Sequence, residues 1–176
     1  MEVSVLRIGH RVVRDDRVTT HVVLVSRAFG SRRIYMTEVD NSIKETLAKV
    51  VKRWGGSDFN VEIVRDWKKV ITTWKKNSGI VVHLTMYGIN VDEAIIDIVG
   101  KGRVLVVVGA QKVPNELFHL ADHNVAVGNQ PHSEIAALSI FLDRIFQGTQ
   151  LKRDFRGAKI KIIPNVRGKH VKMLDK

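Results

Sequence analysis

Six short runs of mostly apolar, often β-branched residues recur along the chain and predict six strands. They cover residues 3–8, 32–37, 59–64, 80–85, 103–109 and 123–128. Several of these runs are continuously apolar instead of alternating with polar residues. That pattern is typical of parallel strands that are covered on both faces of a sheet.

Helical spacing of apolar residues fills the intervals between these runs. We expect helices at 16–29, from Asn41 or Ser42 to Gly55, from Asp66 to Asn77, at 91–99, shortly after Pro114, and after Pro131. Pro131 suits the first position of the last helix, which leaves Gln130 near its cap. The alternation of strand and helix predicts an α/β fold with a mostly parallel sheet and right-handed crossovers.

The residue pattern changes after Gly148. A polar connector leads into two short segments that alternate apolar and basic residues, one on each side of residues 164–168. This pattern predicts a β-hairpin, so we divide the chain into a domain at 1–150 and a basic hairpin extension at 151–176. Its lysines either block an exposed strand edge or face RNA, and the sequence leaves both roles open. The basic side chains are Lys159, Lys161, Arg167, Lys169, His170 and Lys172.

Composition narrows the class of protein. The 176 residues suit one domain with a sizeable core, and 44% of them are hydrophobic. No apolar run approaches the roughly 18 residues that span a bilayer, and the first residues lack a signal-peptide layout, so we expect a cytoplasmic protein with no membrane partner. The chain has no cysteine, which excludes disulfides and thiolate metal sites. His119 and His123 are four residues apart, but no third ligand is evident, and we expect no metal.

The net charge points to a polyanion. Lys and Arg number 29 against 18 Asp and Glu, giving a formal charge of +11. Simple solubility is the plain alternative, but an excess this large on a small chain favours nucleic acid as the partner. Such binding would weaken as salt rises.

Glycine-bearing loops follow three of the predicted strands, at Gly88, Gly109 and Gly128. The chain has neither a phosphate loop nor the glycine-rich turn of dinucleotide-binding folds. Loops at the carboxyl ends of parallel strands surround a ligand crevice, so the three together predict a cofactor pocket, although glycine also simply punctuates strand ends. Helix capping would explain Ser133 and Glu134, but it leaves residues 128–130 unexplained.

Arginines and histidines concentrate near the amino end. Arginine is suited to bidentate phosphate contact, so this segment predicts a surface that faces phosphate or ribose; an exposed, charged helix start is the alternative. The side chains are Arg7, His10, Arg11, Arg14, Arg17, His21 and Arg27.

Four stretches resemble one known family. LRIGHR with RDDRVTTHVVLVSRAFG, VVHLTMYG, VVVGAQKVP and VAVGNQPHSEIAALSIFLDR resemble the archaeal tRNA ribose 2′-O-methyltransferases that act on cytidine 56, within the SPOUT superfamily. The resemblance covers nearly all of 3–148. It implies a SPOUT-type α/β fold with a deep trefoil knot, a homodimer, S-adenosyl-L-methionine as cofactor and tRNA as substrate. A non-catalytic α/β RNA-binding module is the alternative function.

The resemblance also implies site residues. For catalysis it implies an arginine of the first motif, for which we select Arg17 first, with Arg14 and His21 behind it. For the cofactor it implies loops whose residues are Leu84, Gly109, Ala110, Gln111, Lys112, Val113, Val127, Gly128, Asn129, Gln130, Pro131, His132, Ser133 and Glu134.

Overall fold

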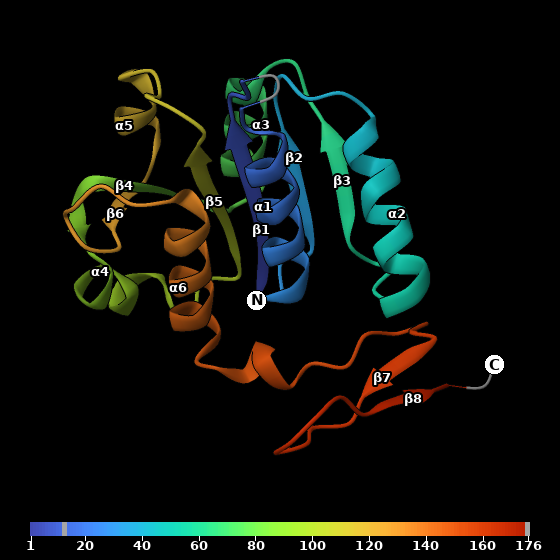
Figure 1. The fold of residues 1–176 in the computed structure, drawn as a ribbon. Helices are drawn as coiled ribbons and strands as arrows, with labels where there is room; N and C mark the ends of the chain where they lie inside the picture. The colour runs from blue at the N-terminus through green and yellow to red at the C-terminus, as the bar shows by residue number, and fades with distance from the viewer. Residues whose placement is uncertain (12–13, 175–176) are drawn as a thin grey trace.

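A computed structural model describes residues 1–11 and 14–174, and it contains a six-stranded parallel sheet (Figure 1). The strand order is β3-β2-β1-β5-β4-β6, and each neighbouring pair is parallel. This confirms the predicted α/β architecture. The strands are β1 Glu2–Ile8, β2 Arg33–Met36, β3 Asn60–Ile63, β4 Ile80–Asn90, β5 Arg103–Gly109 and β6 His123–Ala126.

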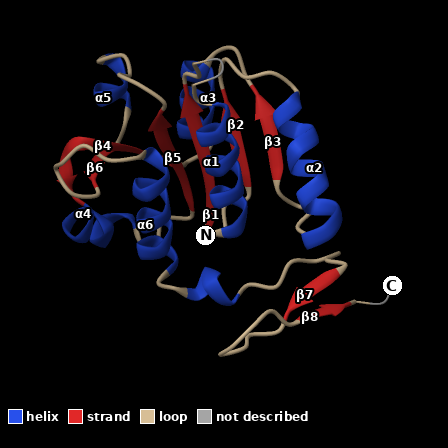
Figure 2. Ribbon diagram, viewed as in Figure 1, coloured by secondary structure: helices blue, strands red, loops and turns tan. Residues whose placement is uncertain are grey.

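Helices cover both faces of the sheet, as Figure 2 shows. One face packs against α1, α2, α4 and α6 through one apolar cluster, and the other packs against α3 and α5 through a second. The helices are α1 Asp16–Ala28, α2 Ser42–Trp54, α3 Trp67–Lys76, α4 Val91–Ile98, α5 Glu116–Leu120 and α6 Glu134–Phe146, followed by the 3-10 helix η1 Thr149–Lys152.

Alternate residues of the central strands enter opposite cores. In β5, Val104, Val106 and Val108 join the α1/α6 side, whereas Leu105 and Val107 join the α3/α5 side. Side chains of a strand point alternately to its two faces. Because both faces are buried, the strand reads as a continuous apolar run, which is why the sequence revealed it.

One predicted helix start is wrong. Neither Pro131 nor Gln130 begins or caps α6: the helix starts at Glu134, and the Ser133 hydroxyl caps it by accepting from the amide of Ala136 at 3.2 Å. A side-chain oxygen at this position satisfies an amide that has no partner within the helix. Residues 127–133 therefore remain a loop.

The carboxyl-terminal segment forms the predicted hairpin. Strands β7 Ile160–Ile162 and β8 Val171–Met173 pair antiparallel, and the hairpin lies beyond the amino-terminal ends of the sheet strands (Figure 1). The boundary between 1–150 and 151–176 as domains stays a prediction. Within the described residues, the helices are all too short or too polar to cross a bilayer.

Candidate functional site: a cavity at the carboxyl ends of β4, β5 and β6

A cavity of about 480 Å³ opens where the irregular middle of β4 and the loops after β5 and β6 meet the segment that leads into α1. Ligand pockets typically enclose roughly 300–1,000 Å³. An adjoining cavity of about 650 Å³ shares part of its wall. The first is lined by Arg11, Asp15, Val18, Leu84, Thr85, Met86, Val108, Gly109, Ala110, Gln111, Val127, Gly128, Gln130, Pro131, His132, Ser133, Glu134 and Ala137.

The loops selected from the sequence come together in space. All of the expected cofactor residues except Lys112, Val113 and Asn129 line the first cavity. Lys112 and Val113 line the adjoining one. The strands β5, β4 and β6 are neighbours at one edge of the sheet, so the loops after β5 and β6 meet beside residues 84–86 of β4. That these residues bind a cofactor stays a prediction.

Asn129 ties two walls of the cavity to each other. Its Nδ2 donates to the carbonyl oxygens of Met86 at 2.7 Å and of Gly88 at 3.2 Å. The register between β4 and β6 shifts between Leu84 and Ile89, so the intervening residues bulge out and meet the loop after β6. Asn129 therefore holds the shape of the site from behind its lining.

Gly88 serves packing and lies outside the lining of both described cavities. A Cβ at this position would collide with the backbone carbonyl of Asn124 on β6. The close approach of two backbones thus requires glycine here. The prediction of a loop at Gly88 is wrong: β4 continues through Gly88 to Asn90 with an irregular register, because its backbone packs closely on β6. Thr85 and Met86 line the cavity instead of Gly88.

The conformation of the loop after β6 is held by a glycine with positive φ and by side-chain hydrogen bonds. Gly128 has a φ of 72°, a backbone conformation that costs a β-branched residue most. The Nε2 of His132 donates to the carbonyl oxygen of Val127 at 2.6 Å, which closes the loop on itself. At the far end, Glu134 accepts from Nε of the buried Arg7 at 2.8 Å.

Arg11 and Asp15 form the charged rim of the cavity. Arg11 donates from its backbone amide and Nε to one carboxylate oxygen of Asp15, at 2.8 and 3.0 Å, and from Nη2 to the other at 2.9 Å. The hydrogen bonds from the Arg11 guanidinium lower the pKa of Asp15 to about 2. The carboxylate stays charged at neutral pH and fixes the arginine beside the cavity.

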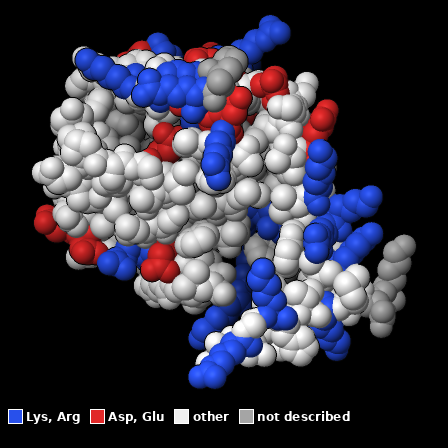
Figure 3. Space-filling model, in the orientation of Figure 1, with Lys and Arg blue, Asp and Glu red and all other residues white. Residues whose placement is uncertain are grey.

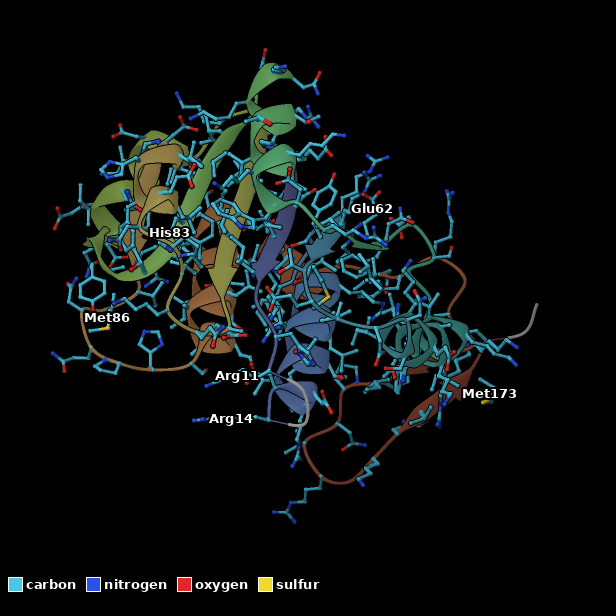
Figure 4. The ribbon with its side chains drawn as sticks, turned by 90° about the horizontal axis from the view of Figure 1, so that it is seen from above. Arg11, Arg14, Glu62, His83, Met86 and Met173 are labelled. Atoms are coloured by element: carbon cyan, nitrogen blue, oxygen red, sulfur yellow. The ribbon has the colours of Figure 1, made fainter. Side chains whose placement is uncertain are left out.

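The catalytic candidates lie just outside the cavity wall. Arg14, Arg17 and His21 are exposed, and none of them is among the lining residues. Arg17 is the chain neighbour of the lining residue Val18, and His21 lies on the same helix face one turn later. Figure 4 shows Arg11 and Arg14 side by side at the segment that leads into α1. The catalytic role of all three stays a prediction.

Sequence reasoning gave Arg11 no role of its own, although it is the arginine that lines the cavity. The i, i+4 spacing of Arg11 and Asp15 was a usable signal, because side chains so spaced pair when the backbone takes a helical course. Only the structure shows that both side chains line the cavity beside β4 and β5.

The described residues contain no group of three or more His, Cys, Asp or Glu side chains that could hold a metal ion. His119 lies on α5 and His123 on β6, so the pair does not share a helix face.

The sequence matches a known protein family and is similar to proteins from several archaea. Residues 54–172 match the tRNA ribose 2′-O-methyltransferase family. The chain is 59% identical to the tRNA (cytidine(56)-2′-O)-methyltransferase of Thermofilum pendens, over 96% of this chain and 94% of that protein. It is 52% identical to the enzyme of the same name from Thermococcus kodakarensis, with 98% of each chain covered.

Solved structures share the fold at low sequence identity. The SpoU methyltransferase AviRb from Streptomyces viridochromogenes, in complex with AdoMet, gives a TM-score of 0.64 at 12% identity, over 83% of this chain and 57% of that one. The TrmH/SpoU tRNA modifying enzyme of A. aeolicus gives 0.62 at 16% identity, over 86% and 77%. The fold is thus of the SPOUT type, and the chain belongs to the tRNA ribose 2′-O-methyltransferase family.

Proposed function

We propose that this protein transfers a methyl group from S-adenosyl-L-methionine to the ribose 2′-oxygen of cytidine 56 in tRNA. The observation that carries the proposal is the cavity built by residues 84–86 of β4 and the loops after β5 and β6, in a chain that is 59% identical, almost end to end, to an enzyme named for that reaction.

The cavity suits an adenosyl sulfonium compound. Its wall is largely backbone and small or apolar side chains, among them Gly109, Ala110 and Gly128, which present amide and carbonyl groups without added bulk. A Cβ on Gly128 would meet no atom within 4 Å, so open space lies beside that backbone. When bound, S-adenosyl-L-methionine supplies the activated methyl group.

Side chains of this protein would position the ribose, stabilise the negative charge that develops on its 2′-oxygen and accept the proton that this oxygen loses. Arg11, held by Asp15, presents a guanidinium at the rim, and Arg17, Arg14 and His21 extend that basic surface along the start of α1. Arginine binds a phosphate beside the target ribose and stabilises the developing alkoxide. His21, or a water, would accept the proton of the 2′-hydroxyl.

We also propose a homodimer. Several large apolar side chains are exposed around α4 and the distal part of β4, namely Tyr87, Ile89, Ile96 and, on α6, Ile140. Exposed apolar side chains of this size are typical of a protein interface. The trefoil knot implied by the SPOUT resemblance and a cytoplasmic location, where tRNA is matured, belong to the same proposal.

The deciding experiment incubates the protein with a tRNA transcript and labelled S-adenosyl-L-methionine, then maps the methylated nucleotide by mass spectrometry. A matched transcript with 2′-deoxycytidine at position 56 lacks the acceptor oxygen and should stay unlabelled. Equal labelling of both transcripts would contradict the site. Binding of tRNA without heat of binding for the cofactor would favour the non-catalytic RNA-binding module.

A further inference from the structure

The carboxyl-terminal extension carries most of the net charge of the chain. Residues 151–176 contain nine Lys and Arg against two acids, a net +7, whereas residues 1–150 contain 20 against 16, a net +4. Figure 3 shows blue Lys and Arg side chains gathered over the hairpin, and further ones along the neighbouring flank of α2. The sequence left open whether they protect a strand edge or face RNA.

The charge of the extension is mostly uncompensated. Of its eight Lys and Arg side chains within the described residues, only Arg153 and Lys161 have an acidic partner, Asp58 and Asp154 respectively. Lys161 also lies directly opposite Lys172 across the two strands. Like charges in such a cross-strand pair are destabilising, so protection of an edge does not by itself account for a lysine placed opposite another lysine.

The two faces of the hairpin differ. The register pairs Ile160 with Met173 and Ile162 with Val171, so these side chains share one face. Because side chains alternate along a strand, Lys161 and Lys172 lie on the other face, together with Lys159. The ribbon is therefore two-sided and presents a row of ammonium groups in one direction.

The extension is docked firmly onto the end of α2. Nη2 of the buried Arg27 donates to the carbonyl oxygens of Trp54 at 3.2 Å and Gly55 at 2.6 Å, and its guanidinium lies 4.3 Å from the ring centroid of Phe155. The amide of Gly56 donates to Arg156 at 2.9 Å. A Cβ on Gly55 would lie 2.6 Å from the backbone of Arg156. A tail that served solubility alone would not need this anchoring.

We infer that the basic face of the hairpin is a docking arm for the phosphate backbone of the RNA substrate, and the identity of that RNA as tRNA rests on the proposed function. The arm lies at the amino end of the sheet and the cavity at its carboxyl end (Figure 1). These ends are separated by the seven residues of β5, about 20 Å. Within one subunit the hairpin therefore binds RNA at a distance from the methylated ribose. It contributes to the affinity for RNA and not to the rate of methyl transfer.

The test replaces Lys159, Lys161 and Lys172, the lysines of the basic face, by Gln in the full chain. A matched control replaces three exposed lysines elsewhere, Lys69, Lys76 and Lys101. Each lost phosphate contact lowers the slope of log Kd against log salt by about 0.7–0.9, so the hairpin variant should lose about 2 in slope and bind tRNA about 10- to 100-fold more weakly near physiological salt. Its single-turnover rate at saturating tRNA, its Kd for S-adenosyl-L-methionine and its melting temperature should match the wild type.

The inference is overturned if the hairpin variant binds tRNA with the affinity and salt slope of the control variant, or if its loss lies in the single-turnover rate with tRNA affinity unchanged. The two proposals fail separately. If the wild type methylates tRNA and the hairpin variant binds tRNA as tightly as the control variant, only the proposal about the hairpin is wrong. If the wild type binds tRNA through these lysines but transfers no methyl group, only the proposed enzymatic function is wrong.

Discussion

Arg7 of β1 and Glu134 at the first turn of α6 form an ion pair across 2.8 Å, with the Arg7 side chain only 1% exposed. The Nη1 of Arg7 also donates to the carbonyl oxygen of Gly9 at 2.9 Å. The pair joins residues 127 positions apart in the chain. It fixes where the loop at 127–133 ends, and with it one wall of the cavity.

Removing Glu134 should therefore be costly. The variant Glu134→Ala leaves the Arg7 guanidinium buried without its partner, and we expect the free energy of unfolding to fall by about 3 kcal/mol, measured by chemical denaturation. The double variant Arg7→Met with Glu134→Leu replaces both charges by apolar groups and should lose less. An equal or greater loss in the double variant would show that the charge pairing is not what matters.

Gly128 should be required for cofactor binding. Valine at a φ of 72° is strained, and its side chain would occupy space beside the cavity wall, so Gly128→Val should raise the Kd for S-adenosyl-L-methionine at least about 10-fold by calorimetry. Gly157→Val is the matched control, because Gly157 has a φ of 75° and lies in the extension. If both variants bind the cofactor like the wild type, the loop after β6 does not hold it.

Replacing Arg17 should lower turnover without changing the affinity for the cofactor. Arg17→Ala removes a guanidinium from the expected ribose-facing surface, and we expect kcat to fall about 100-fold while calorimetry gives an unchanged Kd for S-adenosyl-L-methionine. Arg32→Ala, another exposed arginine, serves as control. Full activity in Arg17→Ala, combined with a large loss in Arg11→Ala, would transfer the role to the arginine that lines the cavity.

Asp15 should make stability depend on acid pH. Its pKa is lowered from 3.8 to about 2 in the folded protein, so its contribution is present above about pH 4 and is lost as the pH falls towards 2. Across this window the wild type should lose more unfolding free energy than Asp15→Asn, whose amide does not titrate. Parallel curves for the two proteins would contradict the assignment.

The proposed dimer should depend on Ile96, which is 76% exposed on α4. We expect Ile96→Glu to convert a dimer into a monomer in sedimentation equilibrium at micromolar concentration, because burying an unpaired carboxylate in an apolar interface is unfavourable. Val166→Glu, at the tip of the hairpin, changes another exposed apolar residue, 99% exposed, and should leave the mass unchanged. A wild type that is already monomeric would remove the proposal.

Local chemistry made several features predictable. The runs that become β1 and β5 are mostly apolar because both faces of the sheet are covered. The helix expected from Asp66 begins at Trp67, and Asp66 caps it by accepting from the amides of Lys68 and Lys69. The start of α6 was mispredicted because proline at 131 and the polar residues around it each fit a helix cap. The competition was decided by Ser133, whose hydroxyl bonds to the helix.

The sequence by itself determined the alternation of strands and helices, the excess of positive charge in the extension and the glycines at the ends of β5 and β6, because each is a property of residues close together in the chain. Only the tertiary structure decided which arginine lines the cavity, that Glu134 pairs with Arg7, and that the hairpin lies at the end of the sheet away from the cavity. The order of strands in the sheet sets those relationships, and contacts between residues more than 100 positions apart leave no periodic trace in the chain.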